Sequence, residues 1–430
     1  MASPVNPPRG MRDFLPADKA RREHALGIIR GIYRAHGFDE IETPVVEDHA
    51  RLHAGLGGDN EKLSFSILKR GIGAEALEEA ARAGDPEQLA DLGLRFDLTV
   101  PLARFYATHR AELPPVFRAI QIAPVWRAER PQKGRYRQFV QADIDIIGEA
   151  GVIAEIELIT ATSQVLAELG LAGCAIRVND RRILFGLLEH VGLAPEHHDR
   201  ALITIDKLDK IGVDGVVAEL AETDAAAAAA LRGVLEGVET ALAAGIPVTR
   251  EAIEAVLPAG AASDGIANLV ALGAALEGGL PDGVAIHFDP TLVRGMGYYT
   301  GTIFEIAHPG SGSSVGGGGR YDGMIGRFLG QDVPAVGFSI GFERVVDLIS
   351  ADSASGPEAV ALVADTEASL DDLMALKRAL VAEGLRVRLE KRQKNMKTLL
   401  ARLEAEGFAR FASVRAGERD AAALAWRDLG

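Results

Sequence analysis

The stretch from Arg127 to Arg137 carries the strongest chemical signal in the sequence. It reads Arg-Ala-Glu-Arg-Pro-Gln-Lys-Gly-Arg-Tyr-Arg, a tight Pro/Gly turn flanked by arginines, and Gln141 and Asp145 follow it. Residues four apart in a strand lie on the same face, so this amide and this carboxylate should share a face. Guanidinium groups bind phosphate oxygens, whereas carboxylates bind an ammonium group. The pattern therefore predicts a sheet face that binds a zwitterion joined to a phosphate. A charged, solvated hairpin explains the charges but not the Gln-x-x-x-Asp spacing.

Three further segments are rich in glycine. Leu292–Gly301 has glycines that let a backbone or a ligand approach closely, next to the pair Tyr298 and Tyr299. A core strand filled with aromatic rings is the alternative interpretation. In Gly337–Arg344, an arginine near the start of a helix either binds phosphate or forms a surface ion pair. The run Gly316–Gly319 lacks the Gly-Lys-Ser/Thr ending of a nucleotide-binding loop, so by itself it predicts a flexible turn.

Length and composition limit the kind of protein. A chain of 430 residues, 48% apolar and 25% charged, folds and has room for more than one domain. Its net charge of -15 means that a nucleic-acid partner needs a local basic patch. The single cysteine, Cys174, excludes an internal disulfide and any site of several cysteines, and it fits a reducing compartment. The N-terminal residues do not resemble a secretory signal, and no uncharged apolar stretch approaches the ~20 residues that span a bilayer. We expect a cytoplasmic protein that does not associate with membranes.

Hydrophobic periodicity predicts the elements that hold these side chains. Each predicted strand has one apolar and one polar face, which indicates an antiparallel sheet with an apolar back. The strand that contains Pro44 should lie at an edge or an interface, because proline lacks a ladder donor. The expected elements are a helix over 18–36, strands over 38–45, 94–99, 125–129 and 140–146, a helix over 154–170, Ala-rich helices over 172–275, strands over 284–306, and a turn, a strand and a helix over 315–349. The alternation of strands and helices after residue 357 predicts a small α/β domain.

These segments together resemble the histidyl-tRNA synthetases, which are class II aminoacyl-tRNA synthetases. Arg127–Asp145 is similar to the second motif of that class, and Gly337–Arg344 is similar to the third. The first helix and the Pro44 strand resemble the first motif, which builds the dimer interface in the class. Leu292–Gly301 and Gly316–Gly323 resemble two histidine-specific signatures. The resemblance implies an α+β fold, in which helices flank an antiparallel sheet.

The resemblance also implies a role for each arginine. Arg127 would hold the α-phosphate of ATP and the carboxylate of histidine, and Arg344 would bind the γ-phosphate. Glu129 and Arg135 would lie near the adenine and the outer phosphates. Arg294 matches an arginine that acts at the α-phosphate, so Arg127 and Arg294 are the expected catalytic residues.

The histidine pocket follows by the same resemblance. Asp97, Thr99 and Gln141 match residues that take the α-ammonium group of the substrate. Asp145 and the tyrosine pair match positions that line the imidazole pocket. Gly297 stands where many members of the family have an acidic residue. The residues expected to bind histidine are Asp97, Thr99, Arg127, Gln141, Asp145, Arg294, Tyr298 and Tyr299.

The activity that the resemblance implies is ATP-dependent ligation of L-histidine to tRNA(His). The reaction would pass through histidyl-adenylate, release AMP and diphosphate, and use Mg²⁺, for which we assign no protein ligand. The working form would be a homodimer. Residues 1–171 and 276–350 would form the catalytic domain, 172–275 a helical insertion, 351–356 a linker, and 357–430 an anticodon-binding domain. Residues 386–397 hold six basic residues and one acidic residue, which suits phosphate contacts, although a solvated helix face is the alternative.

Two other functions remain possible for such a chain. One is a non-catalytic regulatory subunit of ATP phosphoribosyltransferase, which resembles the synthetases but usually lacks the ATP-binding arginines and the anticodon domain. Arg127, Arg135, Arg294 and Arg344 are all present here, which favours the ligase. The other is an adenylate-forming enzyme whose acceptor is not tRNA.

Overall fold

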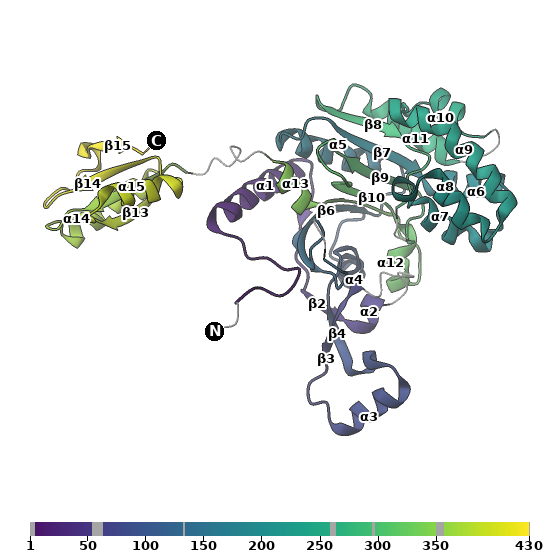
Figure 1. The fold of residues 1–430 in the computed structure, drawn as a ribbon, viewed down its shortest axis with the longest axis horizontal. Helices are drawn as coiled ribbons and strands as arrows, with labels where there is room; N and C mark the ends of the chain where they lie inside the picture. Colours follow the sequence, from purple (N-terminus) through teal and green to yellow (C-terminus); the bar gives the residue numbers. More distant parts are fainter. Residues whose placement is uncertain are drawn as a thin grey trace. The chain divides into compact units, whose positions relative to one another are not determined.

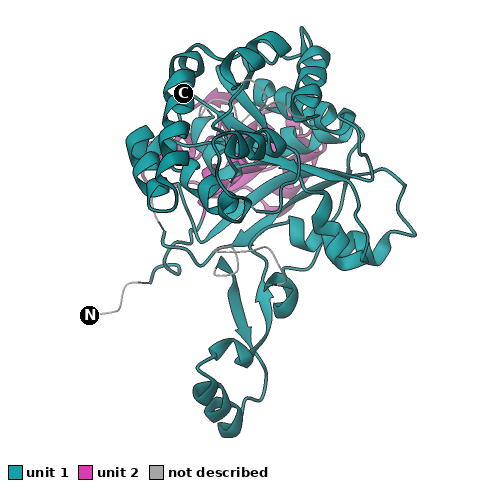
Figure 2. Ribbon diagram, turned by 90° about the vertical axis from the view of Figure 1, so that its right-hand side faces the viewer, with its two compact units in different colours: residues 1–13, 25–349 teal, residues 14–24, 350–430 magenta. Residues whose placement is uncertain are grey.

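The computed structural model describes residues 5–53, 63–131, 134–258, 264–294, 297–349 and 357–429. The chain divides into two compact units, one formed by residues 1–13 and 25–349 and the other by residues 14–24 and 350–430 (Figure 2). The expected linker, 351–356, lies outside the described residues. No helix in the described ranges is long and apolar enough to cross a membrane.

An eight-stranded sheet forms the centre of the first unit (Figure 1). Its neighbours are antiparallel except at the two ends, where β1 runs parallel to β5 and β7 runs parallel to β8. Across the sheet the strands are β1 (Asp39–Glu40), β5 (Phe117–Trp126), β6 (Gln138–Ile147), β11 (Ala335–Ile340), β10 (Gly316–Arg320), β9 (Thr302–Ala307), β7 (Cys174–Asp180) and β8 (Val284–Phe288). The predicted antiparallel sheet flanked by helices is confirmed.

The alternation predicted for β6 is also confirmed. Ala142, Ile144 and Ile146 are fully buried in an apolar core on one side of the sheet. The residues between them, including Gln141 and Asp145, line a cavity on the other side. The short strand β1 lies at the edge of the sheet, as predicted, but it ends before Pro44.

Helices cover both faces of this sheet (Figure 1). One apolar core includes residues of the sheet and of α1 (Pro16–Ala35), α5 (Ile153–Glu168), α10 (Arg250–Val256), α11 (Asp264–Leu276) and α13 (Phe342–Leu348). The other core, on the face that carries the cavity, includes residues of α4 (Thr99–His109), α6 (Arg181–His190), α7 (His198–Ile205), α8 (Leu208–Ala221), α9 (Ala225–Ala244) and α12 (Asp322–Leu329). The short 3-10 helix η3 (Pro195–His197) precedes α7.

The segment 94–99 corrects one prediction, because it is not a strand. A strand, β4, ends at Leu94, and α4 begins at Thr99. The carboxylate of Asp97 accepts a hydrogen bond from the N–H of Val100 at 3.2 Å, which satisfies a free donor of the first helical turn. Pro101 is tolerated in that turn because the N–H groups there have no partner within the helix. The polar side chains at 97 and 99 therefore start a helix rather than alternate along a strand.

A second, smaller sheet belongs to the same unit and extends away from the large one (Figure 1). It consists of β2 (Val46–Asp48), β4 (Ala90–Leu94) and β3 (Phe65–Leu68), with β4 in the middle. The helices α2 (His49–His53), α3 (Ala74–Ala83) and the 3-10 helix η2 (Pro86–Leu89) accompany it. The segment 71–92, for which the sequence shows little pattern, thus contains α3, η2 and most of β4.

The range 172–275 begins with β7, a strand that the prediction of a helical insertion does not include. β7 pairs with β8 and β9 inside the large sheet. Its Ile176 and Val178 are fully buried, while Arg177 faces the other side. The alternation is limited to a few residues, so the Ala-rich helical composition of the following residues conceals it.

The second unit contains a four-stranded sheet with the order β13-β12-β14-β15. The first three strands are parallel and the last is antiparallel. Its elements are β12 (Ala359–Ala364), α14 (Leu370–Ala382), β13 (Arg386–Lys391), α15 (Met396–Ala405), β14 (Arg410–Val414), the 3-10 helix η5 (Ala421–Ala423) and β15 (Trp426–Asp428). The predicted small α/β domain is confirmed.

Candidate active site

A cavity of about 550 Å³ lies over the polar face of the large sheet. All the residues predicted for the site line it, although they come from six different parts of the chain. They are Asp97, Thr99, Arg127, Glu129, Arg135, Gln141, Asp145, Arg294, Tyr298, Tyr299 and Arg344. The structure therefore brings the whole predicted set together, while the individual roles remain predictions.

The register of the sheet sets the floor of the cavity. Directly opposite residues on neighbouring strands share a face. Asp143 of β6 lies opposite Ser339 of β11, and Ser339 lies opposite Gly317 of β10. The same row continues through Glu305 of β9 to Arg177 of β7. The row thus has the carboxylate of Asp143 at one end, the ion pair of Glu305 and Arg177 at the other, and Gly317 in the middle.

Glycines in this floor leave room for side chains to lie on it. A Cβ atom on Gly317 would lie 2.7 Å from the Cζ atom of Arg294, and one on Gly337 would lie 2.0 Å from Oδ1 of Asp145. The run Gly316–Gly319, predicted by itself to be a turn, is in fact part of strand β10. β10 pairs regularly with β11 and β9, so its glycines keep the sheet intact. Because they carry no side chains, they leave space above the sheet, and this space is part of the cavity.

One end of the cavity is acidic. Burial raises the pKa of Asp97 to about 6 and that of Asp145 to about 7. Burial, together with Asp145 beside it, holds the pKa of Asp143 well above its usual range. Three buried acceptor atoms have no hydrogen-bond partner within the protein, namely Oδ2 of Asp97, Oδ1 of Asp143 and Oε1 of Gln141. This end of the cavity therefore favours a cation that can donate several hydrogen bonds.

The side chain of Gln141 is oriented by its neighbours. Its Nε2 donates to Oγ of Ser339 at 3.2 Å and lies 3.4 Å from Oδ2 of Asp143. With the amide nitrogen held on that side, Oε1 is left as an acceptor. The amide is thus arranged to receive a donor from the ligand.

The opposite end of the cavity is basic. Burial, together with Arg135 close by, lowers the pKa of Arg344, and the charges of Arg294 and Arg127 add to this effect. Arg344 donates to the carbonyl oxygen of Ser314. Four guanidinium groups thus act on the same space, a charge arrangement that suits the oxygens of several phosphate groups.

Arg127 lies between the two ends. Its positive charge lowers the pKa values of Asp97 and Asp143, although burial outweighs it. Its Nε donates to the carbonyl oxygen of Phe96 at 3.0 Å, and its guanidinium lies 5.0 Å from the centre of the Phe139 ring. These contacts fix the arginine while most of its donors remain available.

Arg294 is held by a bridge of charges. Its Nη1 donates to Oε2 of Glu305 at 2.8 Å. The other oxygen of Glu305 accepts from Arg177, which also pairs with Asp289 at 3.1 Å. Burial lowers the pKa of Arg294, but Tyr299 and Glu305 outweigh it, so the net shift is upward. The guanidinium is thus positively charged and fixed in direction.

The tyrosines close the side of the cavity next to the carboxylates. Tyr298 and Tyr299 are 7% and 8% exposed, with ring centres 4.7 Å apart. Tyr298 meets Tyr321 edge-on at 6.1 Å, and the hydroxyl of Tyr321 donates to Oδ1 of Asp145 at 2.6 Å. Space for a Cβ atom is free at Gly297, before the tyrosine pair.

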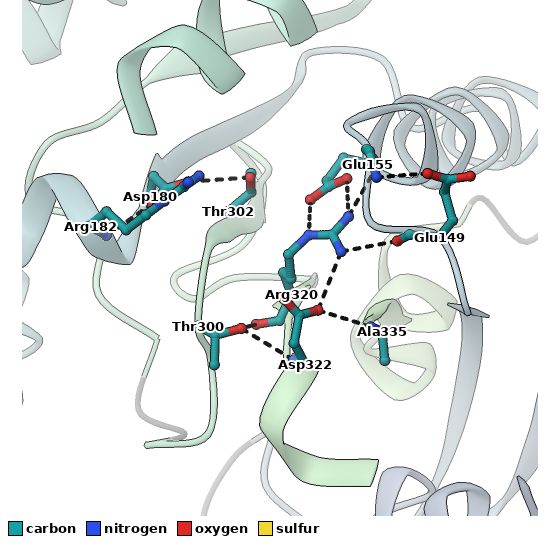
Figure 3. Close-up of polar contacts among 10 residues, drawn as sticks. Glu149, Glu155, Asp180, Arg182, Thr300, Thr302, Arg320, Asp322 and Ala335 are labelled. Carbon is teal, nitrogen blue, oxygen red and sulfur yellow. Dashed lines mark hydrogen bonds and ion pairs between the residues drawn. The ribbon is translucent and has the colours of Figure 1, made fainter. Parts of the chain in front are cut away.

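Arg320, which precedes Tyr321 in the sequence, pairs with Glu155 and Asp322 (Figure 3). Its Nε and Nη2 donate to the two carboxylate oxygens of Glu155, each at 2.7 Å. Its Nη1 donates to Oδ1 of Asp322 at 3.3 Å, and that oxygen also accepts from the N–H of Ala335 at 2.9 Å. Arg320 is therefore a buried clamp between strand and helix, whereas a phosphate-binding role would need it in the cavity.

Sequence reasoning missed Asp143, Glu305 and Tyr321 as site residues, and all three line the cavity. The alternation of β6 places Asp143 on the same face as Asp145, so the pattern contained that signal. Tyr321 follows the glycine run, which gave a weaker hint. No local pattern identifies Glu305, because its role depends on the register that brings it to Arg294.

Comparison with known proteins gives the family. The sequence profile described as "Histidyl-tRNA synthetase" matches residues 63–345. The "Histidine--tRNA ligase" of Leifsonia xyli subsp. xyli is 67% identical over 417 residues, which cover 97% of this chain and 96% of that protein. The "Probable histidine--tRNA ligase" of Tropheryma whipplei is 43% identical over 415 residues, which cover 95% of each.

Solved structures share the fold. A histidyl-tRNA synthetase from Nostoc sp. PCC 7120 superposes with a TM-score of 0.76 at 25% identity, covering 100% of this chain and 95% of that one. A protein from Bacillus halodurans, described as an ATP phosphoribosyltransferase regulatory subunit/histidyl-tRNA synthetase, shares the fold with a TM-score of 0.73 at 22% identity, covering 96% of this chain and 99% of that one. The architecture is thus that of a class II aminoacyl-tRNA synthetase. By its profile match and its curated relatives, the chain belongs to the histidyl-tRNA synthetase family.

Proposed function

We propose that this chain is a histidine-tRNA ligase that joins L-histidine to tRNA(His) through histidyl-adenylate, and releases AMP and diphosphate. The observation that carries the proposal is a single cavity with an acidic end, a basic end and Arg127 between them. An amino acid joined to a nucleotide phosphate has the complementary order of charges. Identity of 67% to a curated ligase over nearly the whole chain supports the same activity.

Binding of histidine uses the acidic end. The α-ammonium group has three N–H donors, and the unpartnered oxygens of Asp97, Asp143 and Gln141 supply three acceptors. A ligand without this ammonium leaves those buried oxygens unpaired, which costs about 1–3 kcal/mol for each. Thr99 lines the same end of the cavity. The substrate carboxylate then lies toward Arg127.

Recognition of the imidazole ring uses Asp145 and the tyrosines. The carboxylate of Asp145 accepts from Tyr321 and keeps capacity to accept a ring N–H. Tyr298 and Tyr299 enclose a flat ring with their aromatic faces. A site that hydrogen-bonds a polar side chain can reject an apolar one by about 10⁴-fold or more, because its own groups are then left unpaired.

Formation of the adenylate relies on fixed positive charge. The histidine carboxylate attacks the α-phosphorus of ATP, the bond from the α-phosphorus to the bridging oxygen breaks, and diphosphate leaves. Negative charge grows on the phosphate oxygens, where preorganised guanidinium groups stabilise it without rearrangement. Arg294 and Arg127 act at the α-phosphate, and Arg344 binds the γ-phosphate. Glu129 and Arg135 lie near the adenine and the outer phosphates.

Magnesium fits this cavity as a companion of ATP. Mg²⁺ is usually bound by substrate phosphates with one or two carboxylates. Of the carboxylates near the arginines, Glu343 pairs with Arg12 and accepts from the N–H of Val140, and Glu129 pairs with Arg135. We therefore assign the ion to the phosphates of ATP and name no protein ligand. When bound, the ion neutralises phosphate charge.

We assign the binding of tRNA to the second unit. Lys391, Lys394 and Lys397 are exposed at the end of β13 and the start of α15, where they can meet RNA phosphates. Arg388 pairs with Glu406, and Arg392 pairs with Asp365, so these two arginines are less available. We assign the anticodon contact to the lysines. We also propose that the working enzyme is a cytoplasmic homodimer. The position of β1 at a sheet edge supports a dimer, because an edge strand offers unpaired backbone groups.

The test is histidine-dependent exchange between ATP and diphosphate, followed by transfer of labelled histidine to tRNA, with other amino acids as controls. Both activities are expected. Exchange without transfer would indicate an adenylate-forming enzyme with a different acceptor. Histidine binding with neither activity would indicate a regulatory subunit and would overturn the proposal.

A further inference from the structure

We propose that His49, His53 and Glu87 form a site for a borderline divalent metal ion such as Zn²⁺, outside the active-site cavity. Their ligand atoms all lie within 4.8 Å of one another. Among the described residues, they form the cluster of three or more His, Cys, Asp or Glu side chains that is close enough to hold a metal ion. Around one zinc ion, ligand atoms lie roughly 3.3–3.5 Å apart, so small side-chain rotations close the site. Two imidazoles and a carboxylate are donors that favour Zn²⁺, Ni²⁺ or Cu²⁺ over Mg²⁺ or Ca²⁺.

The helix α2 presents the two imidazoles together. His49 and His53 are four residues apart, so they lie on the same face of the helix, and their ring centres are 4.1 Å apart. His49 is 9% exposed, which limits the directions that its ring can take. Two neighbouring histidines on one helical turn are a recurrent metal-binding arrangement.

The tautomer of His53 suits a metal ligand. Its Nδ1 donates to the carbonyl oxygen of His49 at 2.7 Å, which leaves the lone pair on Nε2. A hydrogen bond of this type, from the second ring nitrogen to a backbone carbonyl, is the usual support of a metal-bound histidine. Nε2 lies 3.1 Å from Oγ of Ser64, and Nε2 of His49 lies 3.1 Å from Oγ of Ser66. These hydroxyls can rotate and accept a hydrogen bond from a metal-bound water.

The electrostatic surroundings favour a cation. Glu87, Asp48 and Asp85 all act on His49 with negative charge. Asp85 also accepts from the backbone N–H of Glu87 at 3.0 Å, which fixes the start of η2 and the direction of Glu87. Three carboxylates around two imidazoles give a net negative site that a divalent ion neutralises.

The ion would join two elements that are distant in the sequence. α2 follows β2, and η2 leads directly into β4, so bound metal would fix both sides of the small sheet. β4 ends three residues before Asp97, which lines the active-site cavity. The ion is therefore a structural brace, and the proposal does not depend on the ligase activity.

The experiment uses the full chain without a histidine tag, treated with a chelator and then titrated with Zn²⁺. We expect one equivalent to bind, with a dissociation constant on the order of micromolar or below, and Co²⁺ to give the visible absorption of a four-coordinate site. H53Q should weaken Zn²⁺ binding by about 10-fold or more, and E87Q by less, because a carboxylate contributes less than an imidazole to such a site. His109→Gln is the matched control, because His109 is an exposed histidine paired with Glu112, and it should bind zinc like the parent chain.

The melting temperature gives an independent reading. Zn²⁺ should raise it in the parent chain and in the control, and should raise it less in H53Q at the same Zn²⁺ concentration. His53 is half-buried and the side chain of His109 is exposed, so we expect H53Q and His109→Gln to fold. Their melting temperatures without metal report whether they do. No saturable binding at about 100 μM Zn²⁺, or binding that is unchanged in H53Q, would overturn the proposal.

Discussion

Replacing Tyr321 by phenylalanine should weaken histidine binding in a way that depends on pH. The hydroxyl of Tyr321 donates to Oδ1 of Asp145 at 2.6 Å, and this bond lowers the pKa of a carboxyl that burial raises to about 7. A hydrogen bond to a charged group contributes about 1.5–3 kcal/mol, and 1.36 kcal/mol corresponds to one pKa unit. Without the bond, the pKa of Asp145 should rise by roughly 1–2 units.

The magnitude follows from the fraction of Asp145 that is ionised. At pH 7.5, a carboxyl with a pKa of about 7 is about 75% ionised, whereas one with a pKa of 8–9 is about 25% to 3% ionised. If the imidazole binds the ionised form, the dissociation constant of histidine should rise by about 3- to 25-fold at pH 7.5. The sign is fixed, because loss of a donor to the carboxylate can only disfavour the charged form.

The assay is histidine binding by calorimetry between pH 6.5 and 9, on the parent chain and Tyr321→Phe. Both proteins bind the same substrate, so its own titration cancels in the ratio of the two constants. This ratio should fall to about 2 or less at pH 9, where the carboxyl is almost fully ionised in the parent chain and about half ionised or more in the variant. Tyr106→Phe is the control, because Tyr106 packs beside the core and does not line the cavity. A ratio that does not change with pH would refute the role of Tyr321 in setting the charge of Asp145.

Two further changes test the floor of the cavity and the bridge of charges. Gly337→Ala would place a Cβ atom 2.0 Å from Oδ1 of Asp145, so we expect histidine affinity to fall by about 10-fold or more, while Gly323→Ala, with no atom within 4 Å of the added Cβ, leaves affinity unchanged. Equal affinities of the two variants in the same binding assay would contradict this account. Glu305→Gln keeps the shape but removes the charge opposite Arg294, so the single-turnover rate of adenylate formation should fall about 5- to 15-fold with little change in the KM for histidine. A matching rise in KM would mean that the bridge orients the substrate rather than the arginine.

The sequence predicts side chains well where one strand determines their direction. Gln141 and Asp145 lie on the polar face of β6 because alternation has a period of two, and the structure has them there. The same parity applies to Asp143, which was missed because its role depends on its buried neighbours rather than on its position. Its raised pKa arises from burial and from Asp145, and neither effect can be read from a linear pattern.

Prediction fails where position depends on contacts between distant segments. Asp97 was expected on a strand, because polar and apolar residues alternate around it. In the structure it satisfies the first turn of α4 instead, and Gln121 of β5 donates to the carbonyl oxygen of Leu98 at 3.0 Å to hold the segment in place. The glycines of β10 were expected in a turn, since a glycine run lacks the apolar pattern of a strand. Their strand conformation follows from pairing on both sides, which only the fold supplies.

The separation of charges in the cavity explains why both substrates are needed for chemistry. Burial disfavours charge at both ends of the cavity, because it raises the pKa values of Asp97 and Asp145 and lowers that of Arg344, which the charge of Arg135 lowers further. In the proposed function, the ammonium group of histidine would stabilise the ionised carboxylates, and the phosphates of ATP would stabilise the charged guanidinium groups. The charge of Arg127 acts on the carboxylates of the acidic end and on Arg344 at the basic end. The carboxylate of histidine and the α-phosphate of ATP would therefore meet beside Arg127. Positive charge that is already fixed in the folded protein would offset the repulsion between the carboxylate and the phosphate, so the reaction itself would need little rearrangement.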